Sequence, residues 1–388
     1  MPFCSRDGDG FLNPQLQRRI WRRDALSTVS GGLLLAGLGA RPAPAHSLSS
    51  ARFPGVNREE WETFRSRYVT GDGRVVDTGN GNCSHTEGQG WGMLFAVAFD
   101  DRESFEAIRG WTASTLRRSS DSLHAWRYRP GDRVPVADWN NATDGDIFVA
   151  AALWRAALRW QRPDYAVQAR TMAQDILTLL VRPAGPHMVL LPGVEGFVLA
   201  HGTTVNLSYY AFPMMADLAL AFPSPLWPRI ATDGMALLQA GRFGSWKLPP
   251  DWLRVDRDGR LRPDPKWPPR FSYDAIRIPL YLSWSGLMPP QMRAALASFW
   301  VSHRNSLPAW VDLMTEAQAG YQASPGFRAV AQLALTAPAD PRLTGFPADI
   351  PSVRDCNDYY AAALVLLSRL AWQERGDGLN RSRVLMAG

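Results

Sequence analysis

Residues 82–93 read Asn-Cys-Ser-His-Thr-Glu-Gly-Gln-Gly-Trp-Gly-Met, and they run directly into the apolar segment Leu94–Phe99. This order predicts a loop that enters a helix at its N-terminus, with Ser84 or Thr86 as the cap. Each of the three glycines costs a helix about 1 kcal/mol relative to alanine, so we expect them to make room for a ligand beside the backbone. Alternatively, Glu87 only complements the helix dipole.

Apolar residues recur at helical spacing almost throughout the chain from Glu59 onward. Two short alternating runs, Met188–Leu191 and Phe197–Leu199, predict a small hairpin. Long Pro- and Gly-rich loops fall on alternate connections, which favours an all-α toroid of antiparallel helix pairs whose long loops build the site on one face. The predicted helices are Glu59–Tyr68, Glu87–Phe99, Arg102–Leu116, Asp144–Trp160, Tyr165–Val181, Tyr209–Ala221, Pro225–Gly241, Tyr273–Trp284, Pro290–His303, Pro325–Leu335 and Asp358–Trp372.

The composition is that of a globular protein, with 46% hydrophobic and 20% charged residues in a chain of 388. Nothing in it requires a second domain. The 16 Trp and 10 Tyr residues suit either a large core or a cleft that stacks on sugar rings. Half of the net charge of +6 comes from the first 45 residues, which hold six Arg and three Asp. We therefore predict no nucleic-acid surface.

The N-terminus has the pattern of an export signal. A basic region at residues 18–26 precedes the small and apolar run Ser27–Ala40, and residues 41–45 end in Ala-Pro-Ala before His46. The pair Arg22-Arg23 resembles a twin-arginine signal, typical of a bacterial protein exported after folding. We predict a cleavable signal over 1–45, a catalytic domain over 46–388, and a periplasmic or secreted location without stable membrane insertion. An ordinary secretory signal or an uncleaved anchor is the alternative.

Removal of that signal leaves two cysteines, Cys83 and Cys356. Two cysteines in an oxidising compartment raise the chance of a disulfide. By spacing alone, one bond and two free thiols are equally good interpretations.

Two further acidic clusters stand at the starts of predicted helices. Residues 139–146 read Trp-Asn-Asn-Ala-Thr-Asp-Gly-Asp, in which Asn141 or Thr143 is the predicted cap. Asp144 and Asp146 flank a glycine, but the further oxygen ligands of a calcium loop are missing, so we predict no metal site. The third cluster is Asp274 with an arginine three residues later, on the same helix face.

Three carboxylates that open three different helices of a toroid would converge on its central cleft. Hydrolysis of a glycosidic bond needs this chemistry, because one acid protonates the leaving oxygen and another acts on the anomeric carbon or on a water.

The three acidic segments and their order resemble glycoside hydrolase family 8, the bacterial endoglucanase family with an (α/α)6 barrel. Residues 82–98 are similar to the family segment Ser-Glu-Gly-Gln-Gly-Tyr-Gly-Met-Leu, with Thr86 and Trp91 in place of Ser and Tyr. Residues 142–146 resemble the family signature Ala-Ser/Thr-Asp-Ala/Gly-Asp. Residues 206–210 are similar to Asn-Pro-Ser-Tyr, with Leu207 in place of the proline.

Residues 250–252 and 272–277, Pro-Asp-Trp and Ser-Tyr-Asp-Ala-Ile-Arg, resemble most the subgroup associated with bacterial cellulose synthesis. The likeness extends over most of the chain, with every motif in order.

The resemblance implies roles for individual residues. Glu87 stands where the family has its general acid, Asp274 where it has the general base of an inverting mechanism, and Asp144 where an aspartate holds the sugar ring at the cleavage point. We expect a raised pKa for Glu87 and an ionised Asp274, helped by Arg277. An inverting pair requires a carboxyl separation of roughly 6.5–9.5 Å. Tyr209 is expected to contact the water or the sugar.

Trp126 and Trp139 are the candidates for stacking on sugar rings, and Trp91 is a weaker one; core packing is the alternative for each. The implied barrel makes the first and last inner helices neighbours. The resemblance therefore favours a Cys83–Cys356 disulfide.

The resemblance thus implies an inverting endo-β-1,4-glucanase without cofactors, a monomer, whose partner is β-1,4-glucan and for which a cellulose synthase complex is a further candidate. The same fold acting on xylan or chitosan is one alternative, and a non-catalytic glucan-binding protein is another. An (α/α)-barrel lyase is a remote one.

Overall fold

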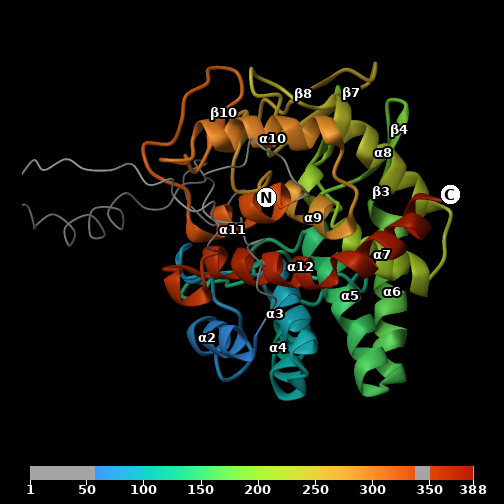
Figure 1. Ribbon diagram of the computed structural model, residues 1–388. Coiled ribbons are helices and arrows are strands. Elements are labelled where there is room, and N and C mark those ends of the chain that lie inside the picture. The colour runs from blue at the N-terminus through green and yellow to red at the C-terminus, as the bar shows by residue number, and fades with distance from the viewer. Residues whose placement is uncertain (1–56, 337–349, 388) are drawn as a thin grey trace, which may run out of the picture. The chain divides into compact units, whose positions relative to one another are not determined.

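The structure is a computed structural model that describes residues 57–336 and 350–387, so the predicted signal over 1–45 lies outside the described residues. Every predicted helix is present (Figure 1), although α7 and α9 begin later than predicted and α12 is longer. The helices are α2 (Arg58–Tyr68), α3 (Thr86–Ala98), α4 (Arg102–Thr115), α5 (Thr143–Trp160), α6 (Pro163–Leu180), α7 (Phe212–Ala221), α8 (Leu226–Ala240), α9 (Arg277–Ser285), α10 (Pro290–Ser302), α11 (Pro325–Leu335) and α12 (Tyr359–Met386).

From α2 to α11, successive helices alternate between half-exposed and almost wholly buried. In α3, α5, α7, α9 and α11 most side chains are buried, whereas α4 between them buries only Ser104, Phe105, Ile108 and Thr112. A helix that is apolar all round belongs inside, and an amphipathic one covers it. This alternation produces the inner and outer helices of the predicted toroid.

The inner helices pack against one another in sequence, α3 on α5, α5 on α7, α7 on α9 and α9 on α11, and α12 packs on α7, α9 and α11. Tyr359, at the start of α12, stacks on Trp91 of α3, with ring centroids 6.3 Å apart. The last inner helix therefore meets the first, and their N-termini lie together as the family resemblance implied. No helix in the described part of the chain combines the length and the apolar character that crossing a bilayer requires.

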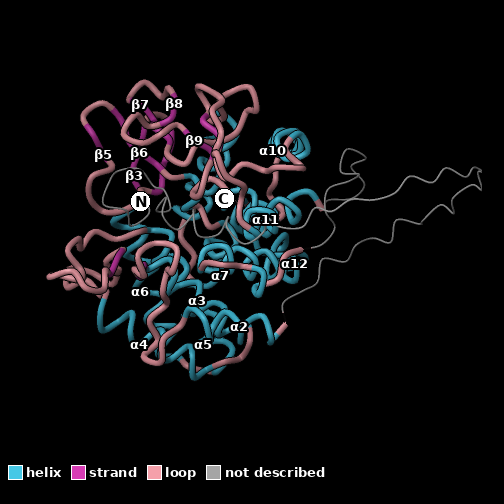
Figure 2. The backbone as a smooth tube through the Cα atoms, turned by 90° about the vertical axis from the view of Figure 1, so that its left-hand side faces the viewer, coloured by secondary structure: helices cyan, strands magenta, loops and turns pink. Residues whose placement is uncertain are grey.

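The strands are short and antiparallel, and Figure 2 shows β5–β9 gathered together, away from α2 and α4. The predicted hairpin of residues 188–191 with 197–199 is wrong, because β4 pairs with β3, and β5 pairs with β6. Strand pairing depends on segments that the local pattern does not identify. The strands are β1 (Ser84–His85), β2 (Arg127–Tyr128), β3 (Val181–Ala184), β4 (His187–Leu190), β5 (Val198–Leu199), β6 (Gly202–Val205), β7 (Leu253–Asp256), β8 (Leu261–Pro263), β9 (Arg270–Phe271) and β10 (Val311–Asp312).

The predicted helix caps are also wrong. His85 caps α3, and the N-cap position of α5 is Ala142, without a side-chain hydrogen bond. Asn141 instead donates to Asp146, and Thr143 donates to the Leu191 carbonyl at 2.6 Å. Polar residues near the start of α5 thus bind neighbouring segments and anchor the loops that surround the site.

Candidate active site

Three carboxylates converge on the guanidinium group of Arg277, the first residue of α9. Its Nη1 contacts Glu87 Oε1 and lies 3.1 Å from Asp144 Oδ2, while its Nη2 lies 2.7 Å from Asp274 Oδ1. The side chains of Arg277 and Asp144 are 3% exposed, and those of Glu87 and Asp274 are 13% exposed. The structure thus brings together all three predicted acids, from α3, from α5 and from the turn before α9.

Glycines bring Glu87 and Asp144 together by letting α3 and α5 approach each other. A Cβ on Gly90 would lie 2.7 Å from Phe148 Cβ, and one on Gly145 would lie 2.6 Å from the backbone nitrogen of Glu87. Both separations are too short for any other residue. The expectation that Gly88, Gly90 and Gly92 leave room for a ligand is wrong. A Cβ on each would meet protein atoms, those of Tyr359, of the partner helix and of Val75 respectively.

His85 fixes the first turn of α3, and the sequence analysis missed it. Its Nδ1 accepts a hydrogen bond from the Gly88 backbone at 3.0 Å, and its Nε2 lies 3.4 Å from Asp77 Oδ2. Because Nδ1 accepts, the proton of the neutral ring is on Nε2, facing Asp77. The ring also lies 3.9 Å from Glu87 Oε2. Histidine is not a preferred N-cap, so the local pattern gave no signal.

Asp274 lies in a turn just before α9 and does not open the helix itself. The side chains of Asn206 and Trp252 lie beside it, and both lower its pKa. Burial, together with the negative charge of Asp144, raises the pKa of Asp274 to about 6. Arg277 also donates to the Ser208 hydroxyl at 2.9 Å, which links this turn to the 3-10 helix Leu207–Tyr209. Asp274 is therefore ionised at neutral pH but titrates within the range of enzyme assays.

Asp144 is buried at the start of α5, where its Oδ1 accepts a hydrogen bond from the Gly145 backbone at 2.8 Å. Burial raises the pKa of Asp144 to about 6, although the Gly145 hydrogen bond and His85 act in the opposite direction. Two neighbouring carboxylates with raised pKa values are typical of catalytic sites.

Asp146 points away from this group. It accepts hydrogen bonds from the backbone and the Nδ1 of His124, both at 3.0 Å, and from Asn141 at 3.0 Å. Its role is to hold the segment that leads to Trp126. Among the described residues, no group of three His, Cys, Asp or Glu side chains is arranged to hold a metal ion.

The predicted sugar-contacting aromatic residues lie in different surroundings. Trp91 is fully buried between Phe148 and Tyr359, so its prediction as a sugar contact is wrong. Trp126 is 8% exposed, with Arg127 over its ring at 4.1 Å. Trp139 is 51% exposed and lines a surface pocket of about 360 Å³ with Asp138 and Asn140.

Tyr209 is buried next to the acids, with the Arg277 guanidinium 5.6 Å from its ring centroid. Beside it, Trp252 is stacked between Phe197 and Trp267, and the two tryptophan rings lie 4.2 Å apart. The sequence analysis did not identify this stack. Its sequence signal is the Pro-Asp-Trp segment at residues 250–252, which carries part of the family resemblance.

The predicted Cys83–Cys356 disulfide is wrong in this structure. Cys356 has a free and buried thiol, whose sulfur donates to the Ser352 carbonyl at 3.4 Å. The two segments are neighbours, since Tyr359 donates to Thr78, but the Cys356 side chain is directed into its own turn.

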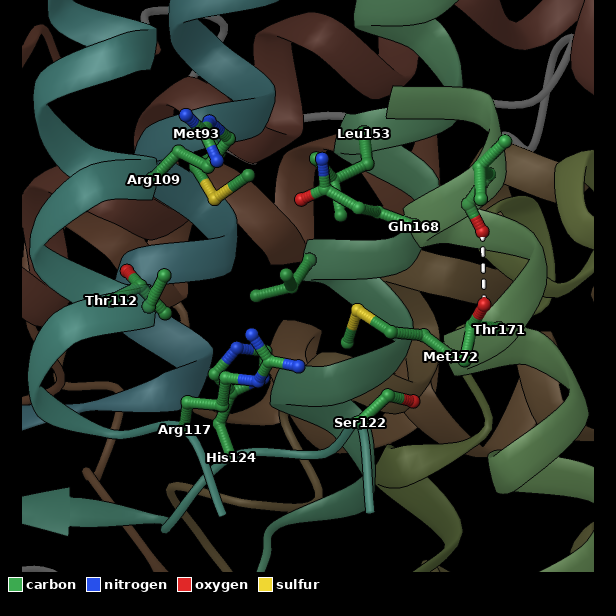
Figure 3. A pocket seen from close by; sticks show the side chains of 13 residues that line it. Met93, Arg109, Thr112, Arg117, Ser122, His124, Leu153, Gln168, Thr171 and Met172 are labelled. Atoms are coloured by element: carbon green, nitrogen blue, oxygen red, sulfur yellow. Dashed lines mark hydrogen bonds between the residues drawn. The ribbon is translucent and has the colours of Figure 1, made fainter. Parts of the chain in front are cut away.

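A second cavity, of about 200 Å³, lies between α4, α5 and α6 (Figure 3). Arg109, Arg117 and His124 contribute its basic groups, and Met93 and Met172 are among its apolar ones. None of the three converging carboxylates lines it, so it is separate from the candidate active site.

The chain belongs to glycosyl hydrolases family 8, whose sequence profile matches residues 44–374. It is 42% identical to a probable endoglucanase of Novacetimonas hansenii, over 90% of this chain and 98% of that protein. It is 41% identical to an endoglucanase of Cellulomonas uda, over 73% of this chain and 79% of that protein.

The fold matches the structure of endo-beta-1,4-glucanase CMCax from Acetobacter xylinum with a TM-score of 0.77 and 44% identity, over 82% of this chain and 98% of that chain. The fold is accordingly the predicted (α/α)6 barrel. A reducing-end-xylose releasing exo-oligoxylanase also matches, with a TM-score of 0.65 at 19% identity, which shows a shared fold alone.

Proposed function

We propose that this protein is an endo-β-1,4-glucanase that cleaves its substrate with inversion at the anomeric carbon. The observation that supports this function best is the convergence of Glu87, Asp144 and Asp274 on Arg277 in a family 8 chain. A probable endoglucanase and an endoglucanase match the chain at 42% and 41% identity.

The proposed reaction needs one proton donor and one proton acceptor. Glu87 gives its proton to the glycosidic oxygen as the bond from that oxygen to the anomeric carbon breaks. A water attacks the same carbon from the opposite face and gives its proton to Asp274. Asp144, which contacts the same arginine as these two groups, holds the sugar ring at the cleavage point.

The pKa of Asp274, about 6, suits a general base at neutral pH, because the group is ionised there and still accepts a proton readily. Arg277 favours that ionised form, since its Nη2 lies 2.7 Å from Asp274 Oδ1. The buried Tyr209 and the indole of Trp252 limit how far Asp274 can turn away from the water.

Comparison of wild type with Glu87→Gln on carboxymethylcellulose, xylan and chitosan tests this function. We expect cleavage of carboxymethylcellulose alone, and its loss in the variant. Cleavage of xylan or chitosan instead would reassign the substrate. Binding of the glucan without cleavage, equal in both proteins, would make the protein a glucan-binding module.

We further propose that residues 1–45 direct export to the periplasm or beyond, that residues 46–388 form one catalytic domain, and that the enzyme acts beside a cellulose synthase. The basic and apolar N-terminal pattern supports export, and the likeness to the synthesis-associated subgroup supports the synthase. Fractionation of a cellulose-producing bacterial host, with Arg22→Lys and Arg23→Lys together as the variant, tests the twin-arginine route. Unchanged export would contradict it.

A further inference from the structure

We propose that Asp251 is a positioning residue for the catalytic base, and that it acts in its neutral form. This inference depends on the proposed function in one respect, the role of Asp274 as the base. Nothing in the family resemblance assigned a role to Asp251.

Asp251 holds the turn that carries Asp274 from both sides. Its Oδ1 accepts hydrogen bonds from the backbone of Ser272 at 3.0 Å and of Ala275 at 2.8 Å. The Ser272 side chain also hydrogen-bonds to it. In addition, the Asp251 backbone donates to the Arg270 carbonyl at 2.7 Å. These bonds fix the residues immediately before and after Tyr273 and Asp274.

The next residue, Trp252, completes the support. Its side chain lies beside Asp274, and its ring is stacked on Trp267 at 4.2 Å. Two consecutive residues, Asp251 and Trp252, therefore fix the turn and the carboxylate separately. A displacement of either would move Asp274 relative to the attacking water.

The charges around Asp251 favour its neutral form. Asp274 on the turn is its acidic neighbour, and Asp144 on α5 adds negative charge beyond Asp274. The one arginine of the group, Arg277 on α9, bonds to Asp274; no ion pair to Asp251 exists among the described residues. Burial, together with the charge of Asp274, raises the pKa of Asp251 to about 8. At neutral pH one proton therefore stays on the pair, on Asp251.

The two carboxyl groups thus have distinct roles. Asp274 forms an ion pair with Arg277, which stabilises the negative charge of Asp274. Asp274 is therefore the group that can take a proton from water. The backbone N–H groups that bond to Asp251 favour its ionised form, but burial and the charge of Asp274 outweigh them. Asp251 therefore stays protonated and holds the turn without placing a second negative charge beside the base.

The test compares Asp251→Asn, which keeps an acceptor oxygen and carries no charge, with Asp251→Ala, which removes both. We expect kcat of the Asn variant within about threefold of wild type, whereas the Ala variant loses about 10²-fold in kcat with little change in KM. Thermal unfolding of both proteins shows whether the Ala variant is folded.

Carbon-13 NMR of Asp-labelled protein supplies a readout that a purely structural role would not change. In wild type we expect one carboxyl that titrates at about pH 8, absent in Asp251→Asn, while the titration of Asp274 at about pH 6 persists. This titration requires no substrate, so it stands apart from the test of glucanase activity.

Three results would overturn the proposal in an active wild-type enzyme. An Asn variant as inactive as the Ala variant would show that the charge of Asp251 is needed. A fully active Ala variant would show that its hydrogen bonds are dispensable. A wild-type Asp251 that is ionised at pH 7 would exclude the neutral form.

Discussion

Two clusters of charged side chains lie at different positions along α5, and they differ in their balance of acids and arginines. At the N-terminal ends of α5 and α9, one arginine, Arg277, faces three carboxylates. Further along α5, Arg155 lies 2.7 Å from Asp217 of α7 and 2.9 Å from Glu374 of α12. Arg381 binds the same two acids at 2.9 and 3.0 Å, so this second cluster is balanced in charge.

The balance decides what the acids do. Burial alone would raise the pKa of Glu374, but Arg155 and Arg381 hold it below the usual value. At Arg277 the acids outnumber the arginine, and the pKa values of Asp144 and Asp274 rise to about 6. Balanced pairs give a structural network, whereas an excess of buried acid gives groups that can exchange protons at neutral pH.

The largest effects are expected when the acids that contact Arg277 are replaced by their neutral amides. We predict that Glu87→Gln and Asp274→Asn each lower kcat on a soluble β-glucan by about 10³-fold, because each removes one proton transfer. Glu59→Gln, an exposed acid on α2, is the control and should leave kcat unchanged. Retention of most activity in Asp274→Asn would remove Asp274 from the catalytic pair.

Disruption of the balanced cluster should affect stability and leave the chemistry intact. Arg155→Met removes one of the two arginines that pair with the buried acids Asp217 and Glu374. We predict a loss of about 3 kcal/mol in the free energy of unfolding, with kcat of the folded enzyme unchanged. Arg159→Met on the same helix breaks the exposed pair with Asp100 and should cause no measurable loss. Equal stability of both variants in urea unfolding would contradict this prediction.

The acids at Arg277 should make the protein less stable as the pH rises. The pKa of Asp274 is about 6 when folded and about 4 when unfolded, so between these values only the folded state keeps the proton. Its contribution to stability therefore falls from pH 4 to pH 6 and stays lost above.

We predict that Asp274→Asn is more stable than wild type by about 3 kcal/mol at pH 7 and nearly equal to it at pH 4. Thermal unfolding at both pH values measures this difference. A variant that is less stable at pH 7 would show that the Arg277 contact outweighs the cost of burial.

The smallest effect is expected at the exposed ring of Trp139. We predict that Trp139→Ala raises KM for cellohexaose about fivefold, with kcat nearly unchanged. The reason is that stacking of a sugar on a flat exposed ring contributes about 1 kcal/mol to the free energy of substrate binding. Leu158→Ala, at a somewhat more exposed apolar residue on α5, is the control. No change in KM would exclude Trp139 from substrate binding.

The sequence predicted the helices well because their signal is local. Apolar spacing of 3.6 residues located every helix of the described part, and three acids at predicted helix starts indicated the site. Its failures concern contacts between distant segments. The local pattern could not show that Gly90 faces Phe148, that β4 pairs with β3, or that Cys356 points into its own turn.

Asp251 was missed for the same reason, because it is 23 residues before Asp274 in the sequence and only the folded chain brings the two together. His85 is only two residues before Glu87, and it was missed because histidine is an unusual cap. The raised pKa values likewise depend on burial by segments from several helices, which no local motif encodes.

The most direct test of the central claim, that Glu87 and Asp274 act as the acid and base of an inverting reaction, is proton NMR of the enzyme during cleavage of cellohexaose. An inverting reaction gives the α-anomer first, and we expect both Glu87→Gln and Asp274→Asn to abolish its formation. Early appearance of the β-anomer would mean retention and would contradict the role of Asp274 as a base that activates water.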